Sequence, residues 1–258
     1  TVSPTTDASA EVVNALAHAY WTAILRRAPL RASYLGDRSR DAELPDLSAS
    51  GRRRFYAEIE GFQSRLKAID FGVLDTRSRL IASVLETRIQ KLLVTRQCQS
   101  WSWAVDQLSG PQVSMAGVPR YHVIDTETRG RDLIARYGQF SRYYLQHQQN
   151  LKAGLIEGRV AARINVERVL EQLSTQLALP ASETPYVAGV RRIMAEKELS
   201  QPYETFDADL LRVVREQVLP ALKGYYDFLQ NEIRPAARLE VGVNQLPGGT
   251  ACYQAQIL

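Results

Sequence analysis

The chain has 258 residues, 45 % hydrophobic and 23 % charged, with a formal net charge of +4. This length suits one large domain or two small ones, and it allows the chain to bury its own core. No apolar run reaches the length of a membrane-spanning helix. Arginines outnumber lysines and are dispersed along the chain, a distribution that argues against a nucleic-acid-binding surface.

Helical spacing of apolar residues dominates the sequence and predicts about seven helices. Pro29 is expected to end the first helix, Pro220 to kink the last and Pro235 to end it. Ser48 or Ser50 is a suitable N-cap for the second helix. The predicted helices cover or lie within residues 7–27, 50–69, 76–93, 130–151, 165–177, 186–199 and 207–233.

A stretch without helical periodicity, SWSWAVDQLSGPQVSMAGVPRYHVIDTETRG, separates the third and fourth predicted helices. It contains two of the three tryptophans and is too apolar for a linker. We expect an ordered aromatic loop at about 100–130. Such loops are uncommon in compact domains and often carry function.

The last residues, VGVNQLPGGTACYQAQIL, have the pattern of a strand, a turn and a second strand. Polar and apolar residues alternate on both sides of Pro247-Gly248-Gly249, where Pro fixes φ and Gly permits positive φ. We therefore expect a β-hairpin, and with it a β element over residues 236–258. A strand at the very end of a chain would leave backbone groups unpaired, so we expect a further segment to follow or to dock there.

One tight basic run, Arg52-Arg53-Arg54, falls in the first turn of a predicted helix. The helix dipole does not favour cations at that end. A solvated helix face is the simplest interpretation, and contact with nucleic acid is the alternative.

The two cysteines, Cys98 and Cys252, form no C-x-x-C motif, which excludes metal binding of that kind. They are either two buried free thiols or, in an exported protein, one disulfide. The polar start TVSPTTDAS resembles a mature chain from which a signal peptide was removed, or a disordered end. The first case implies a periplasmic or secreted protein, and the second a cytoplasmic one.

Few residues offer chemistry. The three histidines, His18, His122 and His147, lie outside any E-x-x-H arrangement, and no Gly-rich phosphate loop, G-x-S-x-G or paired Cys/His motif is present. We expect no catalytic residue and no metal ligand in this chain, and no peptidase activity from it alone.

The order of features resembles the bacterial family called domain of unknown function 885 (DUF885). The resemblance rests on a helix, Pro29 and then Leu35-Gly36-Asp37 near the start, and on a helix break at Gly154 and Gly158 in the middle. At the end it rests on a long helix with Tyr225 and Phe228-Leu229, followed by Pro235, Arg238, Gly242, Pro247-Gly248-Gly249 and Tyr253.

This resemblance implies the N-terminal half of a helical, cleft-shaped zinc peptidase similar to angiotensin-converting-enzyme-like carboxypeptidases. Full-length members of the family carry an H-E-x-x-H helix in their second half, and this chain lacks it. Zinc is then expected in the complete enzyme, held by the missing half. The partner would be that half, as a second chain or a cleaved remainder, across a large apolar interface, and this chain alone would be poorly soluble.

Substrate-binding residues are expected in two places. In the β element, Asn244, Thr250 and Tyr253 could orient a carbonyl group, and Gly248 and Gly249 permit close backbone approach. Extended backbone there could pair with a peptide substrate. The alternative is a plain hairpin that packs the two halves together.

The aromatic loop is the second place. Trp103 and His122 could line the cleft, and Arg120 could bind a terminal carboxylate. The alternative is that this loop merely caps the core.

The sequence thus predicts a mainly α protein: a multi-helix bundle or half of a cleft, with a short C-terminal β-hairpin. The predicted boundaries are a flexible N-terminus over residues 1–10, a helical domain over 11–235 and the β element over 236–258. The predicted function is one wall of the substrate cleft of a metallopeptidase-like hydrolase acting on peptide or amide bonds. A non-catalytic helical binding or scaffold domain is the alternative.

Overall fold

The computed structural model describes residues 6–257, and it describes side-chain burial from residue 9 onward. Helices account for the regular secondary structure of this part of the chain, and the predicted mainly α class is confirmed. Their bounds are α1 Thr6–Arg27, α2 Pro29–Tyr34, α3 Ala49–Lys67, α4 Thr76–Thr95, α5 Pro111–Ala116, α6 Glu127–Tyr137, α7 Phe140–Ile156, α8 Arg163–Leu177, α9 Ala188–Glu196, α10 Phe206–Val213, α11 Leu219–Phe228, α12 Arg234–Ala236 and α13 Gly249–Ile257.

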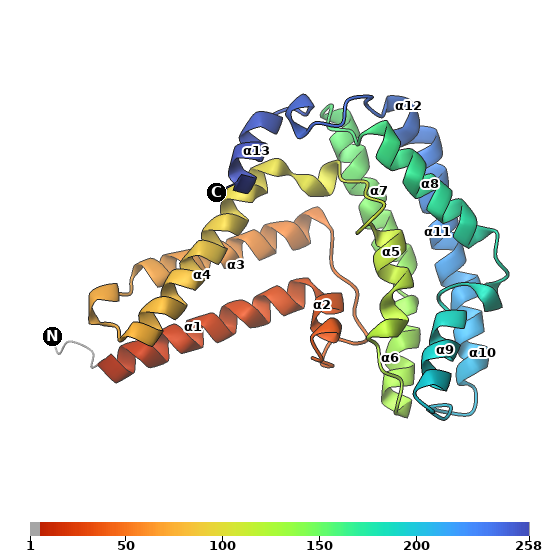
Figure 1. Cartoon of the computed structure of the whole chain (residues 1–258), viewed down its shortest axis with the longest axis horizontal. Helices are drawn as coiled ribbons and strands as arrows, with labels where there is room; N and C mark the ends of the chain where they lie inside the picture. Colours follow the sequence, from red (N-terminus) through yellow and green to blue (C-terminus); the bar gives the residue numbers. More distant parts are fainter. Residues whose placement is uncertain (1–5, 258) are drawn as a thin grey trace.

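The helices form two arms that meet at an angle (Figure 1). The N-terminal arm consists of α1, α3 and α4, each packed against the other two. The C-terminal arm contains α6 to α11, with α11 packed against both α7 and α8. Each arm has its own cluster of buried apolar side chains. Residues 1–5 lie outside the described chain, α1 includes residues 6–10, and the domain boundaries given above stay a prediction.

Side-chain caps set the starts of the helices of the N-terminal arm. Ser48 accepts a hydrogen bond from the backbone N–H of Gly51, as predicted, and Asp75 caps α4 by accepting from Arg77 and Ser78. These caps satisfy donors that the helix itself leaves free. The buried core between the three helices includes Leu16, Ile59, Phe62, Leu66, Leu85 and Ile89.

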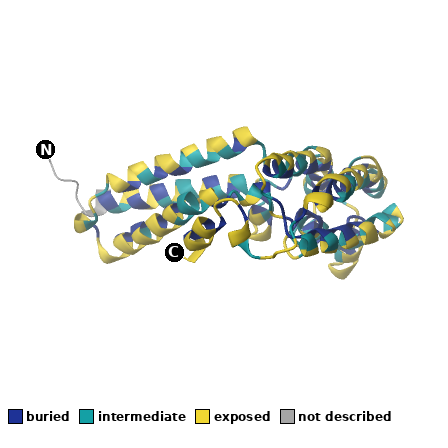
Figure 2. Cartoon of the chain, turned by 90° about the horizontal axis from the view of Figure 1, so that it is seen from above, coloured by how far each residue is buried: buried dark blue, intermediate teal, exposed yellow. Residues whose placement is uncertain are grey.

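The core of the C-terminal arm is aromatic. Tyr137, Phe140 and Tyr186 are fully buried and pack edge to face, with ring centroids 5.4–5.8 Å apart. Tyr144 and Tyr225 extend the cluster, with centroids 5.2 Å apart. Such geometry is favourable for aromatic pairs. Figure 2 shows buried residues along the inner faces of the helices in both arms.

Two prolines alter the last long helix. A π-helical turn, Val214–Val218, precedes Pro220, and a second, Leu229–Ile233, precedes Pro235. Proline lacks an N–H group, and its ring collides with the carbonyl four residues earlier in an α-helix. A wider turn before each proline relieves that collision, so the predicted 207–233 helix is divided by π turns.

The aromatic loop predicted at about 100–130 is ordered and consists of short helical turns. It contains the 3₁₀ turn Ser100–Ser102, helix α5 and the 3₁₀ turn Val118–Arg120. The first of these turns packs against α7. The first turn therefore lies at the junction of the two arms, whereas α5 packs against α8 and the Val118–Arg120 turn against α9 within the C-terminal arm.

The predicted C-terminal β-hairpin is wrong. Within residues 6–257 the structure has no strand, and the one isolated β-bridge joins Ala162 to Arg238. Residues 249–257 form helix α13, and Val243–Gln245 form a 3₁₀ turn. The fold is accordingly mainly α, without the hairpin.

Arginine side chains hold the chain between α12 and α13 in place. Arg238 donates from Nε to Val160 O at 3.0 Å and from Nη1 to Gly242 O at 2.9 Å, and Arg159 donates to Pro247 O. These contacts give main-chain carbonyls hydrogen-bond partners without a second strand. Gly248 has the positive φ expected of the turn, +70°. The alternation of polar and apolar residues after Gly248 does not require a strand, because Gln and Ala are also good helix formers.

The two cysteines form a disulfide, with Cα atoms 4.7 Å apart. Cys98 follows α4 and Cys252 lies in α13, so the bond fastens the last helix to the N-terminal arm. Of the two alternatives left open by the sequence, the disulfide is the one found.

Candidate functional site at the junction of the two arms

The predicted C-terminal site residues lie around α13. Asn244, Thr250 and Tyr253 are exposed, on a 3₁₀ turn and on the helix. Gly249 is buried, and a Cβ at this position would lie 1.8 Å from Val243 O. At Gly249 the close backbone approach is therefore made by the chain to itself, whereas a Cβ at Gly248 would meet nothing within 4 Å.

The three predicted site residues of the aromatic loop lie in different environments. Trp103 donates from Nε1 to Cys98 O at 2.8 Å, which places it beside the disulfide. Arg120 is exposed. His122 is fully buried and packed against α6. The structure does not gather the eight predicted residues into one site, and whether any of them contacts substrate stays a prediction.

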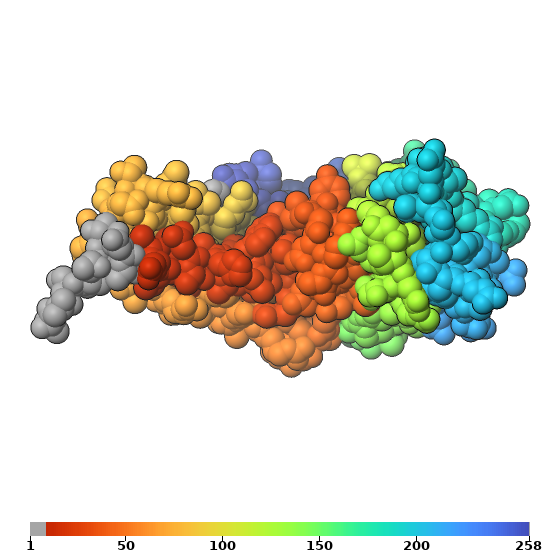
Figure 3. Space-filling view, turned by 90° about the horizontal axis from the view of Figure 1, so that it is seen from below, coloured from red at the N-terminus to blue at the C-terminus, as the bar shows by residue number. Residues whose placement is uncertain are grey.

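His122 belongs to a buried polar network centred on Arg136. Arg136 donates from Nη2 to Ser33 Oγ at 2.8 Å and from Nε to Glu43 O at 3.1 Å. Its Nη2 lies 3.6 Å from Oδ1 of the buried Asp41, which also accepts a hydrogen bond from Ser33. The network ties the segment before α3 to α6. Figure 3 shows that segment between α1 and α6 on the lower face.

The tautomer of His122 follows from its partners. Arg136 only donates, so Nδ1 accepts from Nη1 at 3.3 Å, and Nε2–H donates to Arg129 O at 2.9 Å. Burial, reinforced by the charge of Arg136, lowers the pKa of His122 to about 4. The imidazole is neutral and enclosed. We interpret the network as a structural connection between the arms.

An accessible pocket lies where the arms meet. It has a volume of about 280 Å³ and includes side chains from α1, α3 and α7 and from the first turn of the aromatic loop. Its polar and aromatic lining consists of Arg27, Arg52, Ser100, Trp101, His147 and Asn150. We call it the corner pocket.

Arg52 is the most constrained side chain of the corner pocket. Its Nη1 donates to Leu47 O and to Asn150 Oδ1, both at 2.6 Å. Its guanidinium lies over the Trp101 ring, 5.0 Å from the centroid, at a distance typical of a cation–π contact. Asn150 is held in turn by donating from Nδ2 to Leu47 O at 3.0 Å. A guanidinium fixed in this way presents its other donors in a set direction.

Arg27 and His147 complete the polar lining. Arg27 donates from Nη1 to Asp46 O at 2.6 Å. His147 packs edge to face on Tyr143 with centroids 4.7 Å apart, and its buried Nε2 has no hydrogen-bond partner among the described residues. Burial lowers the pKa of His147 to about 4, so it is neutral near pH 7.

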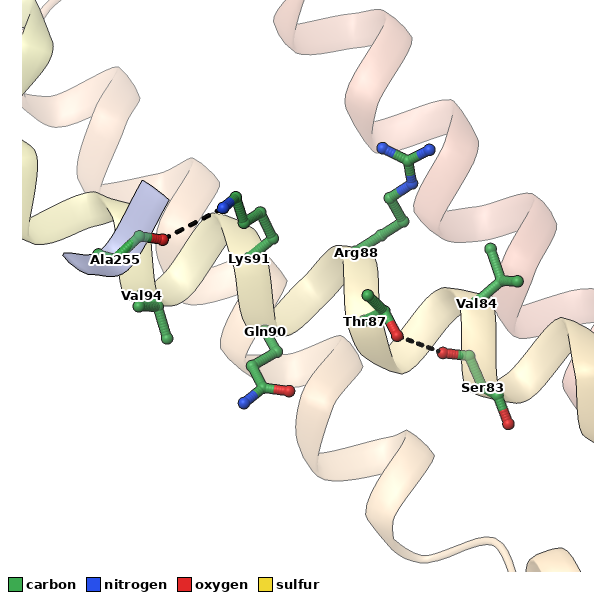
Figure 4. A pocket seen from close by; sticks show the side chains of 8 residues that line it. All are labelled: Ser83, Val84, Thr87, Arg88, Gln90, Lys91, Val94 and Ala255. Atoms are coloured by element: carbon green, nitrogen blue, oxygen red, sulfur yellow. Dashed lines mark hydrogen bonds between the residues drawn. The ribbon is translucent and has the colours of Figure 1, made fainter. Parts of the chain in front are cut away.

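A larger groove of about 650 Å³ runs along α4 beside α13 (Figure 4). Lys91 crosses to Ala255 O at 3.2 Å, and Ser83, Thr87, Arg88 and Gln90 line the rest. These four residues are exposed on a single helix. We favour the corner pocket as the functional site because its polar groups come from several elements and are fixed.

The sequence held two signals for this site. One was Arg52 at the start of a helix, where a cation needs another reason to be present. The other was the first tryptophan of the aromatic loop, Trp101. The apolar spacing around Arg27, His147 and Asn150 shows only helices, so their convergence depends on the angle between the arms.

The described part of the chain lacks both a metal-binding cluster and a membrane-spanning helix. Residues 6–257 contain no group of three or more His, Cys, Asp or Glu side chains arranged to hold a metal ion. No helix among them is long and apolar enough to cross a membrane.

The fold and the corner pocket define an all-helical, two-armed protein with a ligand-sized recess at its bend. Residues 29–258 match the family described as bacterial protein of unknown function, DUF885. The chain belongs to this family, as the resemblance implied.

A solved structure shares the fold. The chain superposes with a TM-score of 0.78 and 17 % identity on "the crystal structure of the putative lipoprotein from Colwellia psychrerythraea". The match covers 95 % of this chain and 45 % of that one, so the chain spans less than half of its relative. No curated protein matches.

Proposed function

We propose that this chain forms one wall of the substrate cleft of a larger helical hydrolase that acts on peptide or amide bonds. The observation that carries the proposal is the corner pocket, in which Arg52, Trp101 and Asn150 are fixed by each other at the bend of the molecule. Fixed polar groups in a concave, partly apolar recess are the ordinary features of a ligand site. The relative of twice the length is consistent with a second half that faces this wall.

The reaction itself is assigned outside this chain. The described residues supply no set of zinc ligands, so they do not fit a zinc centre, and we derive no chemical step from them. The expected zinc would be held by the second half. The part of this chain is to hold substrate, and the exposed Asn244, Thr250 and Tyr253 remain proposed contacts at the far end of the cleft.

A non-catalytic binding or scaffold protein is the second candidate. The observation that favours it is the enclosure of the histidine network: His122, Arg136 and Asp41 are buried and occupied with each other. Such a protein would bind a ligand in the corner pocket and release it unchanged.

An extracytoplasmic location fits the proposal. Cys98 and Cys252 form a disulfide, and such bonds persist in oxidising compartments. The solved relative is described as a lipoprotein.

The test is hydrolysis by the complete gene product. We expect it to cleave members of a mixed peptide library, to lose activity on zinc chelation and to regain it on zinc addition. This chain alone is expected to be inactive and to form a stable complex with the second half. A complete gene product that is zinc-loaded and folded, yet leaves every peptide and simple amide intact, supports the scaffold alternative.

A further inference from the structure

Arg27 and Arg52 both line the corner pocket, are partly buried and are not neutralised by carboxylates. Within residues 6–257, neither lies within 4 Å of an Asp or Glu oxygen, whereas most other arginines do. Their hydrogen bonds go to backbone carbonyls and to the side-chain amide of Asn150. The acceptor oxygens are uncharged, so they hold the two guanidiniums in position without neutralising their positive charge.

The nearest carboxylate is engaged elsewhere. Asp46 pairs with Arg54 at 2.8 Å, and its other oxygen accepts from the backbone N–H of Ser48 at 3.0 Å and from Gln146 at 3.2 Å. The neighbouring pocket on the other side of Arg27 shows the usual arrangement. There an Arg54–Asp46 pair and an Arg26–Glu58 pair at 2.6 Å leave Arg27 as the one unpaired arginine of the lining. The corner pocket has two unpaired arginines, Arg27 and Arg52, and no carboxylate, so it carries the larger excess of positive charge.

Partial burial makes this excess costly. Burial lowers the pKa of Arg27, and it lowers the pKa of Arg52 with a further contribution from the charge of Arg27. Both guanidiniums remain protonated, because arginine does not lose its proton in proteins. Two like charges held close in a poorly solvated recess repel each other, and a bound anion would relieve that repulsion. The first turn of α3, which includes Arg52, adds the positive end of a helix dipole.

The rest of the lining suits an organic group. Trp101, Leu47 and Ala104 supply apolar surface. His147 is neutral, and its Nε2 lacks a partner within the described chain. Buried polar atoms of this kind are normally satisfied by water or by a ligand. The volume of about 280 Å³ is at the lower end for a ligand pocket, so the occupant is small.

We propose that the corner pocket is an anion-recognition site in which Arg27 and Arg52 bind the carboxylate or phosphate of a small organic acid while Trp101 and Leu47 contact its apolar part. The inference rests on the proposed function only in taking the corner as a ligand-facing surface. It concerns binding by this chain, with or without hydrolysis.

Calorimetric titration of this chain tests the proposal. The probes are 3-phenylpropionate, its neutral amide, phenyl phosphate, acetate and inorganic phosphate. We expect the phenyl-bearing anions to bind, the amide to bind at least tenfold more weakly and affinity to fall as salt is added. Tighter binding of phenyl phosphate would identify phosphate as the natural group, and tighter binding of 3-phenylpropionate a carboxylate.

The chain offers a matched pair of variants. Arg52→Gln should weaken the phenyl-bearing anions by about tenfold or more, as expected for a charged hydrogen bond. Arg53→Gln removes the same charge from the next position, where the side chain is exposed, and should change affinity by less than about twofold. Arg52→Lys and thermal melting show whether loss of binding reflects loss of fold. Trp101→Ala should weaken the phenyl probes more than inorganic phosphate, because it removes the apolar surface as well as the ring beneath Arg52.

Two results would overturn the proposal. One is the absence of saturable binding for all four anions by the folded wild-type chain. The other is an equal loss of affinity in Arg52→Gln and Arg53→Gln, which would indicate general electrostatic attraction. Hydrolysis is not measured in this experiment, so failure here and failure of the proposed hydrolase are separate outcomes.

Discussion

The two arms differ in how their cores are built. Among the described residues, the N-terminal arm buries a cluster of ten side chains, of which Phe62 is the one aromatic. The C-terminal arm buries a cluster of thirty-three, eight of them Tyr or Phe. A larger core removes more apolar area from water and immobilises its side chains more completely. The C-terminal arm should therefore be the rigid part of the molecule.

This difference gives the corner pocket its character. The rigid arm contributes His147 and Asn150 from α7, and the smaller arm contributes Arg27 and Arg52 from α1 and α3. Charges from the smaller arm are held against a fixed surface of the larger one. The site therefore depends on the contacts that join the two arms.

Truncation of one core ring in each arm is the most direct test. Phe140→Ala should reduce the free energy of unfolding by about 5 kcal/mol and Phe62→Ala by about 3 kcal/mol, the two ends of the usual range. Phe140 is fully buried among other rings, so its cavity cannot collapse, whereas Phe62 is 5 % exposed in a thinner core. Urea denaturation followed by circular dichroism measures both. Equal losses would remove the distinction between the arms.

Breaking the buried network around Arg136 should reduce the free energy of unfolding almost as much as truncating Phe140. Arg136→Leu leaves the carboxylate of Asp41 buried without its main countercharge, and we expect a loss of about 4 kcal/mol, as for other broken buried pairs. Lys223→Ala breaks an exposed pair with Asp227 on α11 and should cost about 0.4 kcal/mol. The same denaturation experiment compares them. A small effect of Arg136→Leu would mean that water enters the network.

Loss of the disulfide should release α13. The double variant Cys98→Ala/Cys252→Ala should lose about 3 kcal/mol, within the range for native disulfides. The bond closes a loop across a sequence separation of 154 residues, and it attaches α13 to the smaller arm. Hydrogen exchange should show faster exchange confined to residues 249–257 and the end of α4. Faster exchange throughout the C-terminal arm would contradict this localisation.

The sequence predicts most of the helices because their apolar spacing is repeated over several turns. Even the cap at Ser48 follows from local chemistry. The C-terminal hairpin failed for the opposite reason. The few residues after Gly248 fit the period of a strand and the period of a helix equally well, so their local pattern does not decide between the two.

The candidate site shows the same limit. Trp101 and Arg52 carry local signals, a tryptophan in a non-helical segment and a cation at a helix start. Arg27, His147 and Asn150 carry none, because each occupies a helix position that suits many residues. Their role depends on the junction between two arms, and the apolar spacing within each helix does not fix the angle at which the helices meet.

A glycine at the junction should tolerate no side chain. A Cβ at Gly154 of α7 would lie 1.8 Å from Ser102 O, a backbone atom that cannot rotate away. We expect Gly154→Ala to lose about 2 kcal/mol through overpacking. Gly61→Ala is the control, because Gly61 lies in α3 with nothing within 4 Å of the added carbon. That change should stabilise by about 1 kcal/mol through helix propensity.

Taken per histidine and per pH unit, the smallest effect is a dependence of stability on pH that arises at the junction. Burial lowers the pKa of both His122 and His147 to about 4, from an ordinary value of 6.5. His122 faces the charges of Arg136, Arg38 and Asp41. For His147 burial is the cause, because its Nε2 is inaccessible although the residue as a whole is partly exposed.

The direction of the pH dependence follows from the protons that the folded and unfolded chains bind. Between pH 6.5 and about 4 the unfolded chain binds a proton at each of these histidines and the folded chain does not. Acidification in this window therefore favours unfolding, by about 1.4 kcal/mol per pH unit for each histidine. The stabilising contribution is complete above pH 6.5 and is lost as the pH falls toward 4.

Urea denaturation at pH 7, 6 and 5 measures this slope. His147→Gln should reduce it by the share of one histidine while leaving the structure of the N-terminal arm intact. His18→Gln, at an exposed position of α1, controls for the loss of a histidine as such. Two-dimensional NMR of the imidazoles gives the independent measurement, because it follows each ring directly. If the His147 resonance titrates near pH 6.5 in the folded chain, water reaches Nε2 through the corner pocket. The junction would then be more open to solvent than a rigid surface of α7 implies.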